Sequence, residues 1–134
     1  MENKKQKLCI EQVLASKSAG IIWRFIGTAD GLALWFADRA EEVADSLIIT
    51  WGDPAGHHET REAAILERVK GSHIRFWWKD DPEEGCYIEI AMARSELTNE
   101  YVLRITDFAS SEDVDTIREL WEADLRRLHQ AGGI

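Results

Sequence analysis

Apolar and polar residues alternate along most of the middle of the chain, which is typical of β-strands that bury only one face. Between residues 73 and 78, for example, Ile74, Phe76 and Trp78 occupy every second position. Similar alternation, bounded by turn residues, predicts strands at 7–14, 37–43, 46–51, 62–69, 73–78, 86–94 and 101–108. Because the connections are short, neighbouring strands are expected to pair as antiparallel hairpins.

The spacing changes to a helical period in three segments. An apolar stripe between Ser18 and Gly27 predicts a helix at 18–26, because serine favours a helix start and glycine a helix end. Asp30 is expected to cap a second short helix that continues to residue 35. The final helix can be capped by Ser110 or Ser111, and its apolar stripe consists of Val114, Ile117, Leu120, Trp121, Leu125 and Leu128.

Together these elements predict an α+β fold. The last helix must bury its stripe against the inner face of the sheet, because no other large apolar surface is left in the sequence. The residues expected to meet it are Leu47, Ile49, Ile74, Phe76, Ile88, Ile90, Leu103 and Ile105. A chain of 134 residues, 45% of them hydrophobic, fits a single domain over residues 1–134 with a substantial core.

Charge and composition narrow the range of partners. The net charge of −9 would repel a phosphate backbone, so no nucleic-acid partner is expected. The sequence has no run of about 18 apolar residues and no signal-peptide pattern, which indicates a cytoplasmic protein without membrane insertion. Cys9 and Cys86 are predicted to be separate buried thiols rather than a disulfide.

Several segments resemble a known superfamily. They are SAGIIWRFIGTADGLALWFAD, LIITWGD, HIRFWW, ITDFA and LWEADLRRL, in that order along the chain. They are similar to START-like proteins of the helix-grip, birch-pollen-allergen superfamily, to its small bacterial members, and to the homology domain of activators of the heat-shock ATPase chaperone. The resemblance implies a curved antiparallel sheet of about seven strands, two short helices after the first strand and a long C-terminal helix. It also implies a cavity for a hydrophobic or lipid-like ligand, without implying one activity.

Such a cavity would lie between the sheet and the last helix. The residues expected to line it are Trp51, Phe76, Trp78, Ile88, Ile90, Met92, Leu103, Ile105, Ile117, Trp121, Asp124 and Leu128. Asp124 is the polar member, about 40° from the centre of the helix stripe at roughly 100° per residue. Because an isolated buried charge is costly, Asp124 is expected to line a wet cavity or to pair with a cation, and an ordinary salt bridge or a partly exposed position at the rim is favoured.

No sequence pattern requires catalysis or a cofactor. Asp53, His57, His58 and Glu59 are candidate metal ligands, but adjacent histidines on a strand point to opposite faces, so we interpret them as solvated turn residues. The sequence has no CxxC motif, no glycine-rich phosphate loop and no spacing that supports a Ser–His–acid or Cys–His arrangement. We therefore expect no metal and no cofactor, and hypothesise a non-enzymatic protein that binds a small hydrophobic ligand.

The alternative hypothesis is a protein-interaction module, either a homodimer or a chaperone-cofactor-like domain whose cavity is filled. Trp77 shares the outer face of its strand with His73 and Arg75, and aromatic and arginine residues are enriched at interfaces. Arg75 and Trp77 are therefore the predicted interface residues, unless long neighbouring side chains cover the Trp77 ring. An enzyme of the cyclase or hydrolase type ranks third.

Overall fold

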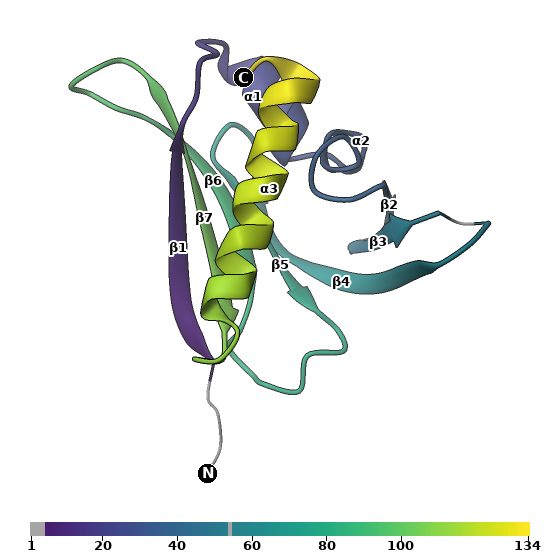
Figure 1. The fold of residues 1–134 in the computed structure, drawn as a ribbon. Coiled ribbons are helices and arrows are strands. Elements are labelled where there is room, and N and C mark those ends of the chain that lie inside the picture. Colours follow the sequence, from purple (N-terminus) through teal and green to yellow (C-terminus); the bar gives the residue numbers. More distant parts are fainter. Residues whose placement is uncertain (1–4, 54) are drawn as a thin grey trace.

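A curved antiparallel sheet wraps around one long helix in this chain (Figure 1). The computed structural model describes residues 5–53 and 55–134, and within them the sheet has seven strands. The elements follow in the order β1 (Gln6–Val13), α1 (Ala19–Ile26), α2 (Ala29–Leu32), β2 (Arg39–Val43), β3 (Ser46–Gly52), β4 (His58–Val69), β5 (His73–Trp78), β6 (Ile88–Arg94), β7 (Tyr101–Ala109) and α3 (Val114–Gly132). The predicted α+β architecture is confirmed.

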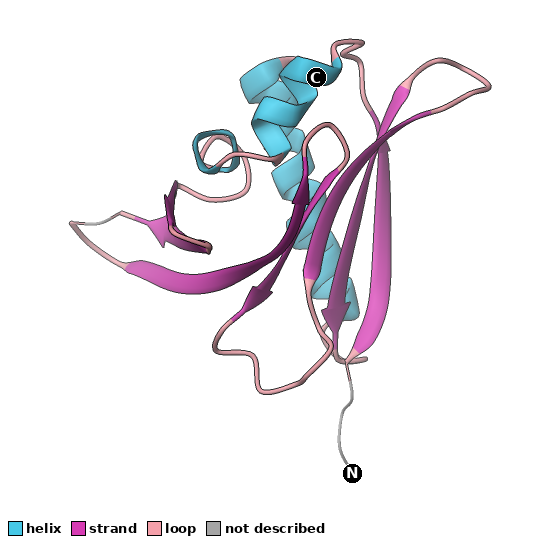
Figure 2. Cartoon of the chain, turned by 180° about the vertical axis from the view of Figure 1, so that it is seen from behind, coloured by secondary structure: helices cyan, strands magenta, loops and turns pink. Residues whose placement is uncertain are grey.

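The strand order is β1-β7-β6-β5-β4-β3-β2, so β1 and β2 form the two edges of the sheet. All neighbours pair antiparallel, and β1 departs from sequence order by pairing with β7. The β4–β5 register shifts between Ile65 and Glu67, and a bulge of this kind bends a strand and increases its twist. Figure 2 shows the sheet from behind, curving toward α3.

The inner face of the sheet and α3 form the hydrophobic core. All eight residues predicted for the inner face are buried. Trp121, Leu125 and Leu128 are buried from α3, as predicted, whereas Val114 and Ile117 are half-buried. Leu120 contradicts the predicted stripe, since 57% of it is exposed. It lies about 100° around the helix from Trp121, beyond the part of the helix surface that the sheet covers.

Side-chain caps explain where the first two helices begin. Ser18 Oγ accepts a hydrogen bond from the Ile21 N–H at 3.3 Å, as predicted for the start of α1. At α2 the prediction is wrong, because Thr28 rather than Asp30 is the cap and accepts a hydrogen bond from the Gly31 N–H at 3.0 Å. Thr28 has the extended backbone that a cap requires, and Asp30 lies in the first turn of α2 instead.

Gly31 allows α1 and α2 to approach closely. A Cβ at this position would lie 1.8 Å from the Arg24 carbonyl oxygen, so only glycine fits. The chain after α2 then enters the core with Trp35 and Phe36. The Trp35 indole N–H donates to the Phe25 carbonyl oxygen at 2.8 Å, which ties this segment to α1.

Several other boundaries differ from the predictions. α2 ends at Leu32 rather than at residue 35, and β2 begins at Arg39 rather than at residue 37. β4 begins at His58 rather than at residue 62, because its first residues pair with the end of β3. β6 begins at Ile88 rather than at Cys86. At the start of α3, Asp113 rather than Ser110 or Ser111 occupies the cap position, and its side chain makes no capping hydrogen bond. The Ser110 hydroxyl donates to the Asp113 carboxylate at 3.0 Å.

The two cysteines differ in environment. Cys86 is buried, as predicted, but Cys9 is exposed because it lies on the outer face of the edge strand β1. Pro54 and residues 1–4 lie outside the described residues. None of the helices described is long and apolar enough to cross a membrane.

Candidate ligand-binding site

Aromatic rings fill the centre of the space between the sheet and α3. Phe36 stacks on Trp121 of α3, with ring centroids 5.3 Å apart and an interplanar angle of 19°. The Phe36 centroid also lies 5.7 Å from Trp51 of β3 and 6.0 Å from Phe76 of β5. Trp78 lies 5.7 Å from Trp51. Rings at these separations pack favourably, so protein side chains occupy the middle of the space.

A cavity of about 320 Å³ remains beside this cluster, and we call it the aromatic pocket. The residues that line it are Phe36, Trp51, Glu59, Arg61, Asp107, Ile117, Leu120, Trp121, Asp124 and Arg127. Charged side chains from β4, β7 and α3 line the pocket together with these rings and aliphatic side chains. A pocket with apolar walls and a few convergent polar groups is typical of small-molecule sites.

A smaller cavity of about 140 Å³ adjoins the aromatic pocket. Both cavities are lined by Arg61, Asp107 and Ile117, while Trp78 and Ile88 line the smaller one alone. Asp107 therefore lies where the two hollows meet.

Asp107, near the end of β7, is a carboxylate held among aromatic rings. Its Oδ2 accepts a hydrogen bond from Trp121 Nε1 at 2.8 Å, and its Oδ1 accepts one from the Phe108 N–H at 2.7 Å. Burial raises the pKa of Asp107 above its usual range, and the two hydrogen bonds oppose part of that rise. Lys5 and Arg61 also lower this pKa through attraction between opposite charges.

Asp124 reaches the pocket from α3. It accepts a hydrogen bond from Arg127, almost one turn further along the helix. Burial raises the pKa of Asp124 to about 6, while the hydrogen bond and the charge of Arg127 oppose that rise. The Asp124 side chain is 14% exposed and that of Arg127 is 48% exposed. Asp124 thus occupies both of the settings that the sequence left open, because it lines a cavity and pairs with a cation.

Arg61 forms a fixed part of the wall between the two cavities. Its Nε and Nη2 donate to the two carboxylate oxygens of Asp80, at 3.1 and 2.6 Å. Its guanidinium carbon lies 4.2 Å from the centroid of the Trp78 ring, which is a cation–π contact. The hydrogen bonds from Arg61 hold the pKa of Asp80 below its usual value. The charge of Arg61 is therefore already engaged within the chain.

The residues predicted to line the ligand cavity lie in several different parts of the structure. Four line the aromatic pocket: Trp51, Ile117, Trp121 and Asp124. Trp78 and Ile88 line the smaller cavity, and Leu128 lines a different hollow on the other side of α3. The others are buried in the core: Phe76, Ile90, Met92, Leu103 and Ile105. Apart from Met92, which is 6% exposed, these core residues have no accessible surface in this structure.

Several pocket residues were not predicted as site residues: Phe36, Glu59, Arg61, Asp107, Leu120 and Arg127. Asp107 has a usable signal, because it continues the inward-facing positions Leu103 and Ile105 along β7. Glu59 and Arg61 precede residue 62, where the strand was expected to begin, so their inward register could not be recognised. Phe36 has no periodic signal, because it lies between α2 and β2.

The predicted interface residues Arg75 and Trp77 lie on the outer face of β5, and both are half-buried. Arg75 donates two hydrogen bonds to Glu89 Oε1, at 3.1 and 2.7 Å, and its guanidinium carbon lies 4.7 Å from the centroid of Tyr87. His73 pairs with Glu67. The charged groups near Trp77 thus have partners within the chain, and the Trp77 ring is partly covered.

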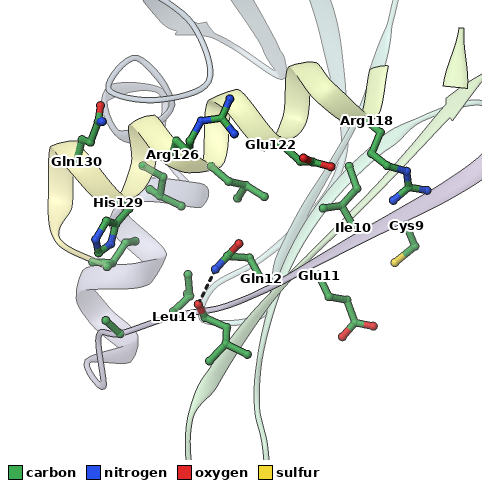
Figure 3. A pocket seen from close by; sticks show the side chains of 15 residues that line it. Cys9, Ile10, Glu11, Gln12, Leu14, Arg118, Glu122, Arg126, His129 and Gln130 are labelled. Carbon is green, nitrogen blue, oxygen red and sulfur yellow. Dashed lines mark hydrogen bonds between the residues drawn. The ribbon is translucent and has the colours of Figure 1, made fainter. Parts of the chain in front are cut away.

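A larger hollow of about 800 Å³ opens on the other side of α3, between this helix and β1 (Figure 3). We call it the β1–α3 cleft. Its apolar lining includes Ile10 and Leu125, and charged side chains of α3 lie around it, among them Arg118, Glu122 and Arg126. None of the described residues that line the cleft is Phe, Tyr or Trp.

Over residues 5–53 and 55–134, no group of three or more His, Cys, Asp or Glu side chains is placed to hold a metal ion. His57 and His58 are both exposed. His58 and Glu59 belong to β4, which corrects their interpretation as turn residues.

Comparisons with known proteins agree with the fold and the sequence motifs. A family model described as the START-like superfamily domain matches residues 1–134. The chain belongs to the START-like superfamily. It is 38% identical to a protein from Bacteroides fragilis whose structure was determined in solution by NMR. The alignment covers 95% of this chain and 90% of that chain, with a TM-score of 0.63. The comparison with curated proteins gave no match.

Two further structures share the fold at lower identity. The Aha1 dimer from Colwellia psychrerythraea is 14% identical, with a TM-score of 0.70 and coverage of 95% of this START-like chain and 96% of that chain. A protein from Bacillus thuringiensis is 13% identical, with a TM-score of 0.74 and coverage of 96% and 100%. At these identities the likeness shows the fold alone. The predicted START-like membership is confirmed by the family model.

Proposed function

We propose that this START-like domain binds a small hydrophobic ligand in the aromatic pocket. The observation that carries the proposal is a cavity of about 320 Å³ between the sheet and α3, walled by Phe36, Trp51 and Trp121. Membership of a superfamily that commonly binds hydrophobic ligands supports it. The predicted residues Trp51, Ile117, Trp121 and Asp124 all meet there.

The size and chemistry of the pocket define the class of ligand. Its volume is near the lower end of the roughly 300–1,000 Å³ of ligand pockets, which favours a compact molecule over a long lipid chain. Flat rings on several walls favour a planar or branched apolar body. Burial raises the pKa values of Asp107 and Asp124, and their carboxyl oxygens can accept a hydrogen bond from a ligand hydroxyl group. We therefore propose an isoprenoid-like or short fatty-acid-like ligand with one oxygen function.

Binding of the neutral apolar dye Nile red tests this proposal. We expect a saturable rise in dye fluorescence that geraniol or decanoic acid reverses by displacement. The melting temperature should rise with ligand concentration, because a ligand that binds only the native state stabilises it. A varied set of apolar ligands that produces neither displacement nor a thermal shift would reject the pocket as a ligand site.

A pair of matched substitutions links binding to the pocket. Leu120 lies at the pocket and is 57% exposed, so Leu120→Trp can place a ring in the opening without disturbing the core. We expect this variant to bind Nile red roughly tenfold more weakly. Leu97→Trp is the control, because Leu97 is 97% exposed and does not line the pocket. Equal binding by the two variants contradicts the proposed location.

A second proposal is that the outer face of the sheet, around Arg75 and Trp77, forms a protein contact. The packed rings support it, because they leave less room for a ligand than an open cavity would. The similar fold of the Aha1 dimer from Colwellia psychrerythraea also supports it. Sedimentation of the wild type beside Trp77→Ala at matched concentration is the test. A variant that associates as strongly as the wild type would leave Trp77 as a covered surface ring.

A further inference from the structure

The outer edge of β1 differs from the opposite edge of the sheet. β1 has eight residues, contains no proline and pairs with β7 in an unbroken register. β2, at the other edge, has five residues, of which Arg39, Glu41 and Glu42 are charged. Long regular edges are templates for pairing with another strand, whereas short charged edges resist it. In the described part of the chain, no strand lies beyond β1.

Alternate residues of β1 direct their main-chain groups to this edge. The Leu14 N–H donates to the Tyr101 carbonyl oxygen at 2.8 Å, and the register then places the even-numbered residues of β1 in the hydrogen-bonded pairs with β7. The N–H and C=O groups of Lys7, Cys9 and Glu11 therefore point away from β7. They are the groups that a further strand would bind.

The side chains of β1 divide between the two faces of the sheet. Lys7, Cys9 and Glu11 are exposed on the outer face, while Leu8 and Ile10 are buried on the inner face. In Figure 3, Ile10 points toward α3 and Glu11 points away from it.

The sequence of β1 is self-complementary about Cys9. If a second β1 pairs antiparallel with the first so that the two Cys9 residues are opposite, the facing pairs between Gln6 and Gln12 are chemically matched, while Val13 at the end of the strand faces Lys5. Amide meets amide, positive meets negative, and aliphatic meets aliphatic, in the pairs Gln6 with Gln12, Lys7 with Glu11 and Leu8 with Ile10. Opposite charges and apolar residues in facing positions stabilise paired strands. Because Cys9 directs its main chain to the free edge, this register also gives complete hydrogen-bonded pairs.

We propose that β1 is a homodimer interface, where a second copy of this chain pairs antiparallel in the register centred on Cys9. The two-fold axis is perpendicular to the sheet, so both inner faces lie on the same side of one continuous sheet. The two α3 helices then lie on that side as well, and the two β1–α3 clefts meet. Each cleft, of about 800 Å³, gives room on the inner face beside the added strand.

The charges near this edge do not oppose the contact, although the whole chain carries −9. Lys7, Arg118 and Arg126 are positive, Glu11 and Glu122 are negative, and Arg104 of β7 lies 3.6 Å from Glu11, so the edge and the rim of the cleft carry a slight positive excess. The negative charge of the whole chain is therefore not concentrated at this contact. This proposal stands whether or not the aromatic pocket binds a ligand.

Charge reversal tests the register. In sedimentation equilibrium of the full chain at moderate salt, we expect a dimer that Lys7→Glu and Glu11→Lys each weaken about tenfold, because each substitution places like charges opposite one another twice. The double variant Lys7→Glu/Glu11→Lys restores both opposite-charge pairs, and we expect it to dimerise like the wild type. A dimer that is indifferent to the single reversals, or that the double variant does not restore, overturns the proposed register.

A main-chain substitution tests the strand pairing itself. Cys9→Pro removes an N–H that points to the free edge, so its pairing with β7 is kept while the dimer loses hydrogen bonds. Cys9→Ser keeps the N–H and is the matched control. We expect a folded monomer for Cys9→Pro, judged by circular dichroism, and a dimer for Cys9→Ser. A folded Cys9→Pro protein that dimerises like the wild type overturns the proposal.

Cross-linking of the wild type decides the matter even if Cys9→Pro fails to fold. Facing α-carbons in a hydrogen-bonded pair lie about 5.5 Å apart, so a short bismaleimide should join the two Cys9 thiols. Cys86 is buried, so Cys9→Ser should give no cross-linked dimer. A wild type that stays monomeric at high micromolar concentration overturns the proposal. A dimer that is lost in Trp77→Ala but kept after the Lys7 and Glu11 reversals also overturns it, and assigns the contact to the outer sheet face.

Discussion

The two sides of α3 are built from the same helix and the same sheet, yet they differ in what they leave open. On the side of β3 and β5, the rings of Phe36, Trp51 and Trp121 pack together, and a pocket of about 320 Å³ remains. On the side of β1, aliphatic residues such as Ile10 and Leu125 line an open cleft of about 800 Å³. The size of the side chains beside the helix therefore decides how much space remains.

The polar groups of the two sides differ as well. In the aromatic pocket, burial raises the pKa of both Asp107 and Asp124, which places polar groups beside apolar walls, as in a small-molecule site. Around the cleft, Glu122 and Arg126 are exposed, and the main chain of β1 points outward along its free edge. Such an edge suits another strand. We therefore propose ligand binding on the first side and self-association on the second.

The largest expected effect is a difference in the free energy of unfolding between substitutions on the two sides of α3. Trp121→Ala should lower the free energy of unfolding by about 3–5 kcal/mol, because it removes a buried ring that packs on Phe36 and donates to Asp107. Leu125→Ala, toward the cleft, should cost about 2–3 kcal/mol, because it removes a smaller side chain. Urea denaturation measures both values. Equal losses would mean that the rings add nothing beyond ordinary burial.

A substitution at Gly31 tests how the segment that carries Phe36 is held in the aromatic pocket. Gly31→Ala should destabilise the protein by about 3 kcal/mol, because its Cβ would clash with the backbone of α1 and displace the segment that carries Phe36. Gly20→Ala in α1 is the control, since a Cβ there meets nothing within 4 Å, and it should stabilise the helix by up to about 1 kcal/mol. Thermal unfolding of both variants, with Nile red binding, checks this. A Gly31→Ala protein of unchanged stability would show that the contact between α1 and α2 can adjust to the added Cβ.

The smallest expected effect is a change in the pH dependence of stability, which arises from Asp124 on the pocket side of α3. The pKa of Asp124 is about 6 in the folded protein, and an unfolded aspartate titrates near about 3.9. The folded state therefore binds more protons between these values, so the contribution of Asp124 to stability falls as pH rises from about 4 to 6. Asp124→Asn removes this loss, so the variant should gain about 1 kcal/mol over the wild type at pH 7 and nothing below pH 4.

The neighbouring residue Glu122 provides the control for this titration. It lies on the same helix but is exposed on the cleft side, so Glu122→Gln shows how much of any change follows from removing one negative charge from α3. Urea denaturation at several pH values gives both profiles. An Asp124→Asn profile parallel to that of the wild type would show that this carboxyl group titrates normally.

Much of the fold follows from local pattern. The alternation at 73–78 predicted β5 and its buried face, and the spacing of Trp121, Leu125 and Leu128 predicted the contact side of α3. Leu120 was misplaced because periodicity gives the direction of a side chain but not the width of the surface that covers it. The prediction of Asp30 as the cap of α2 was wrong, because Thr28, two residues earlier, has a side chain that also caps helices and takes that position.

The candidate site was less predictable than the fold. Trp51, Trp121 and Asp124 were expected in the cavity and line it, but Phe76 and Ile105, on the same inner face, are fully packed. The alternation within a strand decides which side chains point inward. Whether an inward side chain borders a cavity depends on the volumes of side chains from other elements. Arg61 and Asp107 come from strands far apart in sequence, and their approach is set by the curvature of the sheet.

The sequence by itself determined the order of the elements, the buried face of each strand and the START-like family, because these depend on residue patterns within short segments. It also determined the self-complementary order of residues in β1. Only the tertiary structure decided that β1 pairs with β7 and so becomes an open edge, and that rings from β3, α3 and the segment after α2 enclose a pocket. These outcomes depend on contacts between residues distant along the chain, and no local period encodes such contacts.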